Sequence, residues 1–240
     1  MQPNAQPTTE PLIVPQRFHG PPRSGNGGWT AGALAERLSA RADTPVTVAL
    51  RLPPPLDRPL PIAEGEAGIV ATDDGRTVAE ARVDSATPTP VEATTVEVAT
   101  DAQTRYAGFR GHPFPTCFAC GPERAEGDGL HVFPGRLADD PLRVATVWTP
   151  YDVTVPITWA ALDCTSGWAA GVEERPMVLG TMTAQVLRLP LSGQPHVSVG
   201  TLLGVEGRKA RTASSLYTAD GELLATAEQV WITINPDDFS

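Results

Sequence analysis

The sequence predicts an α+β fold in which a helix is followed by an antiparallel sheet, and this order occurs twice along the chain. Three observations lead to this prediction. An apolar segment at 155–171 has the signals of a buried helix. Four strand candidates follow it, at 178–189, 196–206, 209–218 and 223–234. The first half repeats the order with shorter strands, so we expect two similar units packed side by side.

The segment 155–171 is predicted to be a helix that is buried on every face. Thr154 is a suitable N-cap, and Pro156 stands in the first turn, where its missing N–H costs no hydrogen bond. Gly171 is a suitable end. Asp163 is the only charged residue between these signals. A buried carboxylate needs a partner or a function, so Asp163 is either a structural residue that bonds a nearby loop or a catalytic group.

The first half of the chain contains a second helix candidate at 27–41, which Asn26 is expected to cap. Strand candidates follow this helix at 46–52, 60–72 and 76–84. Two short motifs then recur in the same order in both halves of the chain. The Leu-Arg-Leu-Pro sequence at 50–53 returns at 187–190, and the Asp74-Gly75 turn returns as Asp220-Gly221. This echo favours a tandem of related units.

These patterns predict four segments along the chain. Residues 1–11 are polar and Pro-rich and are expected to form a disordered tail. Residues 12–84 form the shorter N-terminal unit, which has one strand fewer. A low-complexity linker at 85–95 leads into the C-terminal unit at 96–240. Residues 96–115, at the start of that second unit, are only weakly patterned.

Composition excludes several classes of partner. The 240 residues have a formal net charge of −10 and a pI near 4.8, which argues against a nucleic-acid or anionic-membrane partner. No apolar segment reaches transmembrane length, and no signal pattern precedes residue 12. The three cysteines, an odd count, fit a reducing compartment. We therefore expect a cytoplasmic protein that uses neither membrane nor nucleic acid.

Two segments resemble the hot-dog fold superfamily. Trp159-Ala-Ala-Leu-Asp163 is similar to the carboxylate segment of its phenylacetyl-CoA thioesterase group. In that group a His-Gly-Gly begins the helix, and a catalytic carboxylate lies on the same helix nine residues after the His. The segment 117–122, with Gly129-Leu130, resembles a loop that often opens such domains. The likeness covers about 115–235 well and 15–84 weakly. It implies a double hot-dog, in which each unit wraps an antiparallel sheet round a central helix.

Each half of the chain has only one part of this family motif. In the second half, Thr154 stands nine residues before Asp163 in place of the family histidine. In the first half, Asn26-Gly27-Gly28 is close to His-Gly-Gly, but Ala35 follows nine residues later, with Glu36 one step beyond. The sequence therefore predicts one composite site per chain, at the seam between the units.

The resemblance implies a thioesterase that acts on an acyl-CoA or acyl-carrier-protein thioester. Backbone N–H groups of Gly27 and Gly28, at a helix N-terminus, would hold the oxyanion, and Asn26 would add a side-chain donor. Asp163, desolvated by burial, would act as the base. The counterpart site would pair residues 154–156 with Ala35 and would be inactive, because Pro156 has no N–H and Ala35 is no base. The candidate substrate-binding residues are Trp29, Trp159, Ser166 and Arg23.

Other interpretations remain open at this point. A non-catalytic acyl-thioester-binding hot-dog protein is favoured by the missing histidine, and Asn26-Gly27-Gly28 can also be an ordinary capped helix start. A hot-dog hydratase ranks last, because the sequence lacks an Asp-x-x-x-x-His pair followed by a helix. Oligomers of double hot-dog chains are a further expectation.

The cysteines raise the question of a metal. Cys117-x-x-Cys120 has the spacing of half a zinc site, with His112 and His131 nearby in sequence, but a second pair is lacking. Cys164, which follows Asp163 on the predicted helix, is interpreted as a small core residue. The segment from Cys117 to Cys120 is therefore interpreted as a turn packed on the sheet. From the sequence we expect no metal and no cofactor, and no zinc requirement for folding or activity.

Overall fold

The computed structural model describes residues 10–38, 41 and 43–235. All but the last two residues of the tail expected at 1–11 lie outside this range. Within it, the expected α+β class is confirmed by an antiparallel sheet of ten strands in the order β4-β5-β6-β2-β9-β12-β11-β10-β8-β7. A small two-stranded ladder, β1 with β3, lies beside it. No helix of this part of the chain has the length and apolarity needed to cross a bilayer.

In the described part of the chain, three α-helices and two short 3₁₀ helices accompany the strands. The helices are η1 Gln16–Phe18, α1 Gly27–Ala35, α2 Val96–Gln103, η2 Ala107–Phe109 and α3 Val155–Ala169. The strands of the first half are β1 Leu12–Ile13, β2 Val46–Leu50, β3 Pro59–Leu60, β4 Ile62–Glu64, β5 Ile69–Asp73 and β6 Arg76–Val83. Those of the second half are β7 Gly135–Arg136, β8 Arg143–Trp148, β9 Met177–Val186, β10 His196–Glu206, β11 Lys209–Thr218 and β12 Leu223–Thr233.

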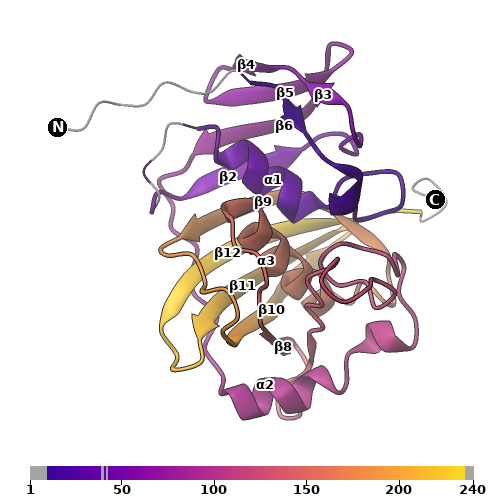
Figure 1. Ribbon diagram of the computed structural model, residues 1–240, viewed down its shortest axis with the longest axis vertical. Helices are drawn as coiled ribbons and strands as arrows, with labels where there is room; N and C mark the ends of the chain where they lie inside the picture. The colour runs from indigo at the N-terminus through magenta and orange to yellow at the C-terminus, as the bar shows by residue number, and fades with distance from the viewer. Residues whose placement is uncertain (1–9, 39–40, 42, 236–240) are drawn as a thin grey trace.

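The two halves share one continuous sheet. Strand β2 of the first half pairs with β9 of the second in antiparallel register, with Val46 opposite Ala184 and Ala49 opposite Thr181. In Figure 1 the indigo and purple strands of the first half lie above the orange and yellow strands of the second. The first half contributes four strands to the sheet and the second half six. Each half therefore has its own helix and strands, as the repeated motifs predicted.

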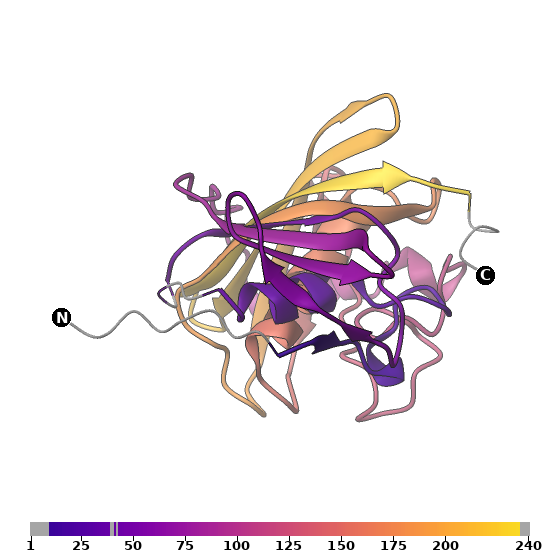
Figure 2. The ribbon, with the colours of Figure 1, turned by 90° about the horizontal axis from the view of Figure 1, so that it is seen from above.

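Helices α1 and α3 pack against each other on one face of this sheet, as Figure 2 shows from above. Glycines on α1 make the close approach possible. A Cβ at Gly28 would lie 2.4 Å from Asp163 Cβ, and one at Gly32 would lie 2.7 Å from Pro156 Cα. These contacts are shorter than Cβ atoms tolerate, so the helix pair needs glycine at both positions. The two central helices thereby bring the two halves into direct contact.

The central helix α3 begins and ends close to where its sequence signals predict. The Thr154 side chain accepts the Ile157 N–H at 3.3 Å as an N-cap, and the helix ends at Ala169. Nearly every residue of α3 is buried, including Asp163 at 2% exposure. Successive side chains of β10 point to opposite faces of the sheet, and those on one face contact α3. Ser198 Oγ meets Thr165 Oγ1 of α3 at 2.7 Å, whereas Val197 and Val199 face the opposite side of the sheet.

Helix α2 and the preceding segment cover that opposite face. Ala99 and Ala102 of α2 pack with Val197, Val199 and Tyr217 in a separate apolar cluster. The segment 85–95, expected as a linker, has no helix or strand but is bonded to the sheet, because Val91 N–H donates to Ser215 Oγ at 3.0 Å. The weakly patterned segment 96–115 therefore contains helix α2, whose buried residues are only Ala99 and Ala102.

Helix α1 is shorter than predicted, ending at Ala35 instead of Arg41. At this end the Glu36 N–H donates to the Gly32 carbonyl at 3.0 Å, and the Arg37 side chain donates to the Ala33 carbonyl at 2.6 Å. The two Asp-Gly turns are tight hairpin connections. Asp74 and Gly75 have φ of 47° and 76°, and Gly221 has φ of 86°. These left-handed conformations explain why glycine recurs at both turns.

Candidate active site at the seam of the two units

The N-terminus of α1 meets the middle of α3. Asn26 caps α1, because its Oδ1 accepts the Trp29 N–H at 2.9 Å. The Gly28 N–H donates to Asp163 Oδ2 at 2.8 Å, across 135 residues of sequence. The carboxylate of the second unit therefore sits against the helix N-terminus of the first, where the helix dipole favours negative charge.

Asp163 is the most perturbed carboxyl group of this seam. Burial raises its pKa to about 8, although the hydrogen bond from Gly28 N–H acts in the opposite direction. Among the described residues its Oδ1 atom is buried without a hydrogen-bond partner. Buried polar atoms without partners are rare and point to strain, a missing ligand or catalysis. Asp163 thus has one oxygen fixed and the other available.

A cavity of about 260 Å³ opens beside this pair. Asn26 and Gly27 of the first unit line it, as does Asp163 of the second. Large apolar side chains form much of its remaining wall, among them Leu50, Phe114, Trp168, Leu179 and Trp231. Gly28 does not line the cavity, whereas Gly27 does, and within the described residues no acceptor is paired with the Gly27 N–H. The cavity therefore combines an apolar wall with one helix N-terminal donor and one carboxylate.

The side-chain amide of Asn26 faces the sulfur atoms of two cysteines. Its Nδ2 lies 3.7 Å from Cys117 Sγ and 3.8 Å from Cys164 Sγ. Sequence reasoning assigned Asn26 as a donor to the substrate, and the structure shows its N–H groups directed to these thiols. Cys117, Cys120 and His112 also line the cavity, and nothing in the sequence pattern connects them with the Asp163 site.

The other sequence candidates lie in different surroundings. Trp29 stacks on Phe18 with ring centroids 4.3 Å apart and is not part of the cavity wall. Trp159 packs against Gly32 and borders a second cavity. Ser166 accepts the Trp231 Nε1–H at 3.0 Å, so it orients a wall residue. Arg23 is exposed between Pro21 and Ser24, which line the cavity.

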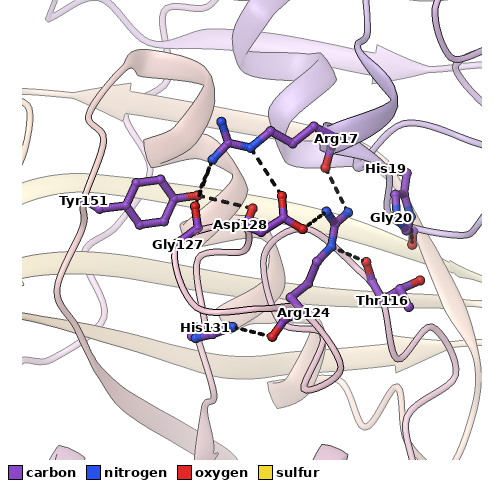
Figure 3. Close-up of polar contacts among 9 residues, drawn as sticks. All are labelled: Arg17, His19, Gly20, Thr116, Arg124, Gly127, Asp128, His131 and Tyr151. Atoms are coloured by element: carbon purple, nitrogen blue, oxygen red, sulfur yellow. Dashed lines mark hydrogen bonds and ion pairs between the residues drawn. The ribbon is translucent and has the colours of Figure 1, made fainter.

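The loop that contains Cys117 and Cys120 is fastened to the first unit by a polar network (Figure 3). Arg124, whose side chain is 8% exposed, donates from Nε to the Thr116 carbonyl at 2.7 Å and from a terminal nitrogen to the Arg17 carbonyl at 2.8 Å. Its other terminal nitrogen meets Asp128 Oδ2 at 2.9 Å. Arg17 in turn donates to the Tyr151 hydroxyl at 2.8 Å. The network holds in place the loop whose residues Phe114, Cys117 and Cys120 line the cavity.

A second cavity, of about 310 Å³, lies where the inactive counterpart site was predicted. Ala35, Val155 and Trp159 line it together with Glu36. Burial raises the pKa of Glu36. Position 35 offers no carboxylate, so this cavity lacks the arrangement of Asp163 against a helix N-terminus.

We expect Gly28→Ala to lower the free energy of unfolding by about 1–3 kcal/mol, because the new methyl group would force α1 and α3 apart. The clash would be with Asp163 Cβ and with the Trp159 carbonyl oxygen at 2.6 Å. Gly204→Ala is the matched control, because a Cβ there meets no atom of the described residues within 4 Å. Urea unfolding of both variants checks this. A Gly28→Ala variant as stable as the control would contradict the helix contact.

Several solved structures have a fold similar to that of this chain. No family model and no curated protein matches the sequence. Among solved structures, a hot dog fold protein of unknown function from Alicyclobacillus acidocaldarius has a TM-score of 0.60 at 16% identity, over 92% of this chain and 90% of that one. A TesB protein from Mycobacterium avium subsp. paratuberculosis has a TM-score of 0.58 at 16% identity, over 90% of each chain.

This chain has the double hot-dog fold. The expectation drawn from residues 159–163 and from the repeated motifs is therefore confirmed at the level of fold. An acyl-CoA thioesterase II, TesB2, from Mycobacterium marinum matches at a TM-score of 0.54 and 12% identity, over 90% of this chain and 92% of that one. At such identities the likeness shows the fold alone.

Proposed function

We propose that this double hot-dog protein is a thioesterase that hydrolyses an acyl-CoA or acyl-carrier-protein thioester. The observation that supports it most is the buried Asp163 carboxylate at the N-terminus of α1, beside an apolar cavity, with Oδ1 unpaired among the described residues. Several solved structures of this fold are named as thioesterases, which agrees with the proposal.

In the proposed reaction, the thioester carbonyl accepts the Gly27 N–H, which helps to stabilise the oxyanion as it forms. Gly28 N–H remains on Asp163 Oδ2 and holds the carboxylate in place. The ionised form of Asp163, whose share grows as the pH approaches the raised pKa of about 8, takes a proton through Oδ1 from a water molecule whose oxygen attacks the carbonyl carbon. The carbon–sulfur bond then breaks, the thiolate leaves with that proton, and the products are a carboxylic acid and the carrier thiol.

The cavity bounds the substrate class. Its wall is largely apolar, which suits an acyl or aryl-acyl chain, and about 260 Å³ lies near the lower end of ordinary ligand pockets. The exposed Arg23 beside its rim is proposed to meet a phosphate of the carrier. In this proposal the second cavity, with Ala35 in place of a base, takes no part in hydrolysis.

A second candidate is a binding protein that holds an acyl thioester without cleaving it. Two observations favour it: Gly28 N–H is already bonded to Asp163, and Thr154 replaces the histidine of the family motif. Such a protein would bind the acyl thioester in the cavity without hydrolysing it.

A two-step experiment separates the candidates. Mass spectrometry of the purified chain is expected to reveal a co-purified acyl-CoA or its free acid, which sets the chain lengths to test. Hydrolysis of acyl-CoA thioesters across those lengths is then followed by release of the free thiol. We expect turnover of at least one thioester. Stoichiometric binding of thioesters that are never cleaved would favour the binding protein.

A further inference from the structure

All three cysteines of the chain gather in one buried cluster, here called the thiol triad. Cys117 and Cys120 come from the loop before β7, and Cys164 comes from α3. Their sulfur atoms lie within 4.8 Å of one another, and Cys117 Sγ is 3.9 Å from Cys164 Sγ. A tetrahedral zinc site with Zn–S bonds of about 2.3 Å has S···S edges of about 3.8 Å. The triad therefore needs only small shifts to match three corners of such a site.

The local backbone holds the sulfur atoms of Cys117 and Cys120 close together. Residues 117–121 form a tight Cys-x-x-Cys-Gly turn, closed by the Gly121 N–H on the Cys117 carbonyl at 2.9 Å. A Cβ at Gly121 would lie 2.5 Å from the Pro115 carbonyl oxygen, so the turn requires glycine. The spacing of two residues between cysteines is that of zinc ligands. Arg124 bonds the carbonyl of Thr116, directly before this turn, and holds it in place (Figure 3).

N–H groups point at each sulfur. Asn26 Nδ2 lies 3.7 Å from Cys117 Sγ and 3.8 Å from Cys164 Sγ, and the orientation of its amide is fixed because Oδ1 accepts the Trp29 N–H. His112 Nδ1 accepts the Phe114 N–H at 2.9 Å, so this nitrogen carries no proton and the ring N–H is on Nε2. Nε2 can then donate to Cys120 Sγ, 3.4 Å away.

Donors of this kind stabilise thiolates and form the outer shell of metal–thiolate sites. Three buried thiolates without a cation would repel one another strongly at such distances. Thiolate sulfur selects soft or borderline metals such as zinc over magnesium or calcium. The chemistry of the triad therefore fits a zinc ion better than any hard cation.

We propose that Cys117, Cys120 and Cys164 bind one Zn²⁺ ion, with the fourth coordination position facing the cavity that all three cysteines line. Binding replaces the three thiol protons, which pass to solvent. The ion would link the loop to α3 and so fix the cavity wall beside Asp163. This proposal replaces the sequence-based expectation of no metal. It does not depend on thioester hydrolysis.

The full chain, reduced and stripped of metal by a chelator, tests the proposal. We expect it to take up one Zn²⁺ per chain by elemental analysis and to unfold at a higher temperature with zinc than without. Co²⁺ in place of Zn²⁺ should give the sulfur-to-cobalt charge-transfer band and the intense visible bands of a four-coordinate site. Absence of stoichiometric metal uptake by the folded, reduced chain overturns the proposal, as does isolation of the chain with a disulfide within the triad and no metal.

Variants locate the ion. Cys164→Ser should weaken Zn²⁺ binding by more than about 100-fold, since changes in the outer shell alone cost 10–100-fold. His131→Asn is the matched control, because His131 belongs to the same loop but bonds the Arg124 carbonyl instead of a sulfur. Its Zn²⁺ affinity should equal that of the wild type. Unchanged affinity in a folded Cys164→Ser chain would place the metal elsewhere and overturn the proposal. If that variant does not fold, the Co²⁺ spectrum of the wild type tests the proposal, and absence of the sulfur-to-cobalt charge-transfer band overturns it.

Discussion

Asp163→Asn is expected to reduce thioester turnover by about 10²–10⁴-fold, the usual cost of removing a general base. The amide oxygen of asparagine can still accept the Gly28 N–H that Asp163 Oδ2 accepts at 2.8 Å, so the helix contact should survive. Acyl-CoA binding should therefore persist while the rate falls. Steady-state hydrolysis and equilibrium binding of the same thioester measure the two effects separately.

Glu36→Gln is the control for this variant. Glu36 is the carboxylate that stands one residue beyond the family spacing in the first half, and it borders the second cavity instead of the first. Its replacement should leave turnover unchanged. Hydrolysis at the wild-type rate by Asp163→Asn, or loss of turnover in Glu36→Gln, would contradict the assignment of the base.

The same Asp163→Asn variant should remove a pH dependence of stability. The pKa of Asp163 is raised to about 8 by burial from an ordinary value of 3.8, so between these pH values the folded chain holds a proton that the unfolded chain releases. In that window each added pH unit should lower the free energy of unfolding of the wild type by roughly 1.4 kcal/mol. The side-chain amide of the variant does not titrate, so its stability relative to wild type should rise with pH, by roughly 3–4 kcal/mol between about pH 5 and pH 8.

Urea unfolding of both proteins at several pH values measures this difference. A chelator and a reductant keep the thiol triad free of metal and disulfides during the measurement. Other titrating groups, such as the partly buried His112 and the buried His196, are common to both proteins and largely cancel. A stability difference that stays constant across this pH range would show that burial does not raise the pKa of Asp163.

Much of the fold follows from the sequence because its signals are local. Thr154 and Pro156 mark the start of α3, and the four strand candidates after it, with the Asp220-Gly221 turn between the last two, correspond to β9, β10, β11 and β12. Helix α2 was missed because it buries only Ala99 and Ala102, which give little hydrophobic periodicity. The end of α1 at Ala35 was also missed, because no glycine or proline follows Ala35 directly to mark a stop.

The candidate site was only partly predictable. Asp163 stood out because it is a lone charge in an apolar helix, and Asn26 and the two glycines stood out as a helix start. Gly28 was interpreted as a substrate donor, whereas its N–H bonds Asp163 and its missing side chain admits α3. The thiol triad was missed because Cys164 comes from a helix 44 residues after Cys120, and only the fold brings the sulfurs together.

A crystal structure of the Asp163→Asn variant with an acyl-CoA thioester bound tests the central claim most directly. The claim is that one composite site per chain places the thioester between the N-terminus of α1 and residue 163. We expect the carbonyl oxygen within hydrogen-bond distance of the Gly27 N–H and the acyl chain along the wall formed by Trp168, Leu179 and Trp231. A thioester seated in the second cavity beside Ala35 and Trp159, or a carbonyl directed away from Gly27, would contradict it.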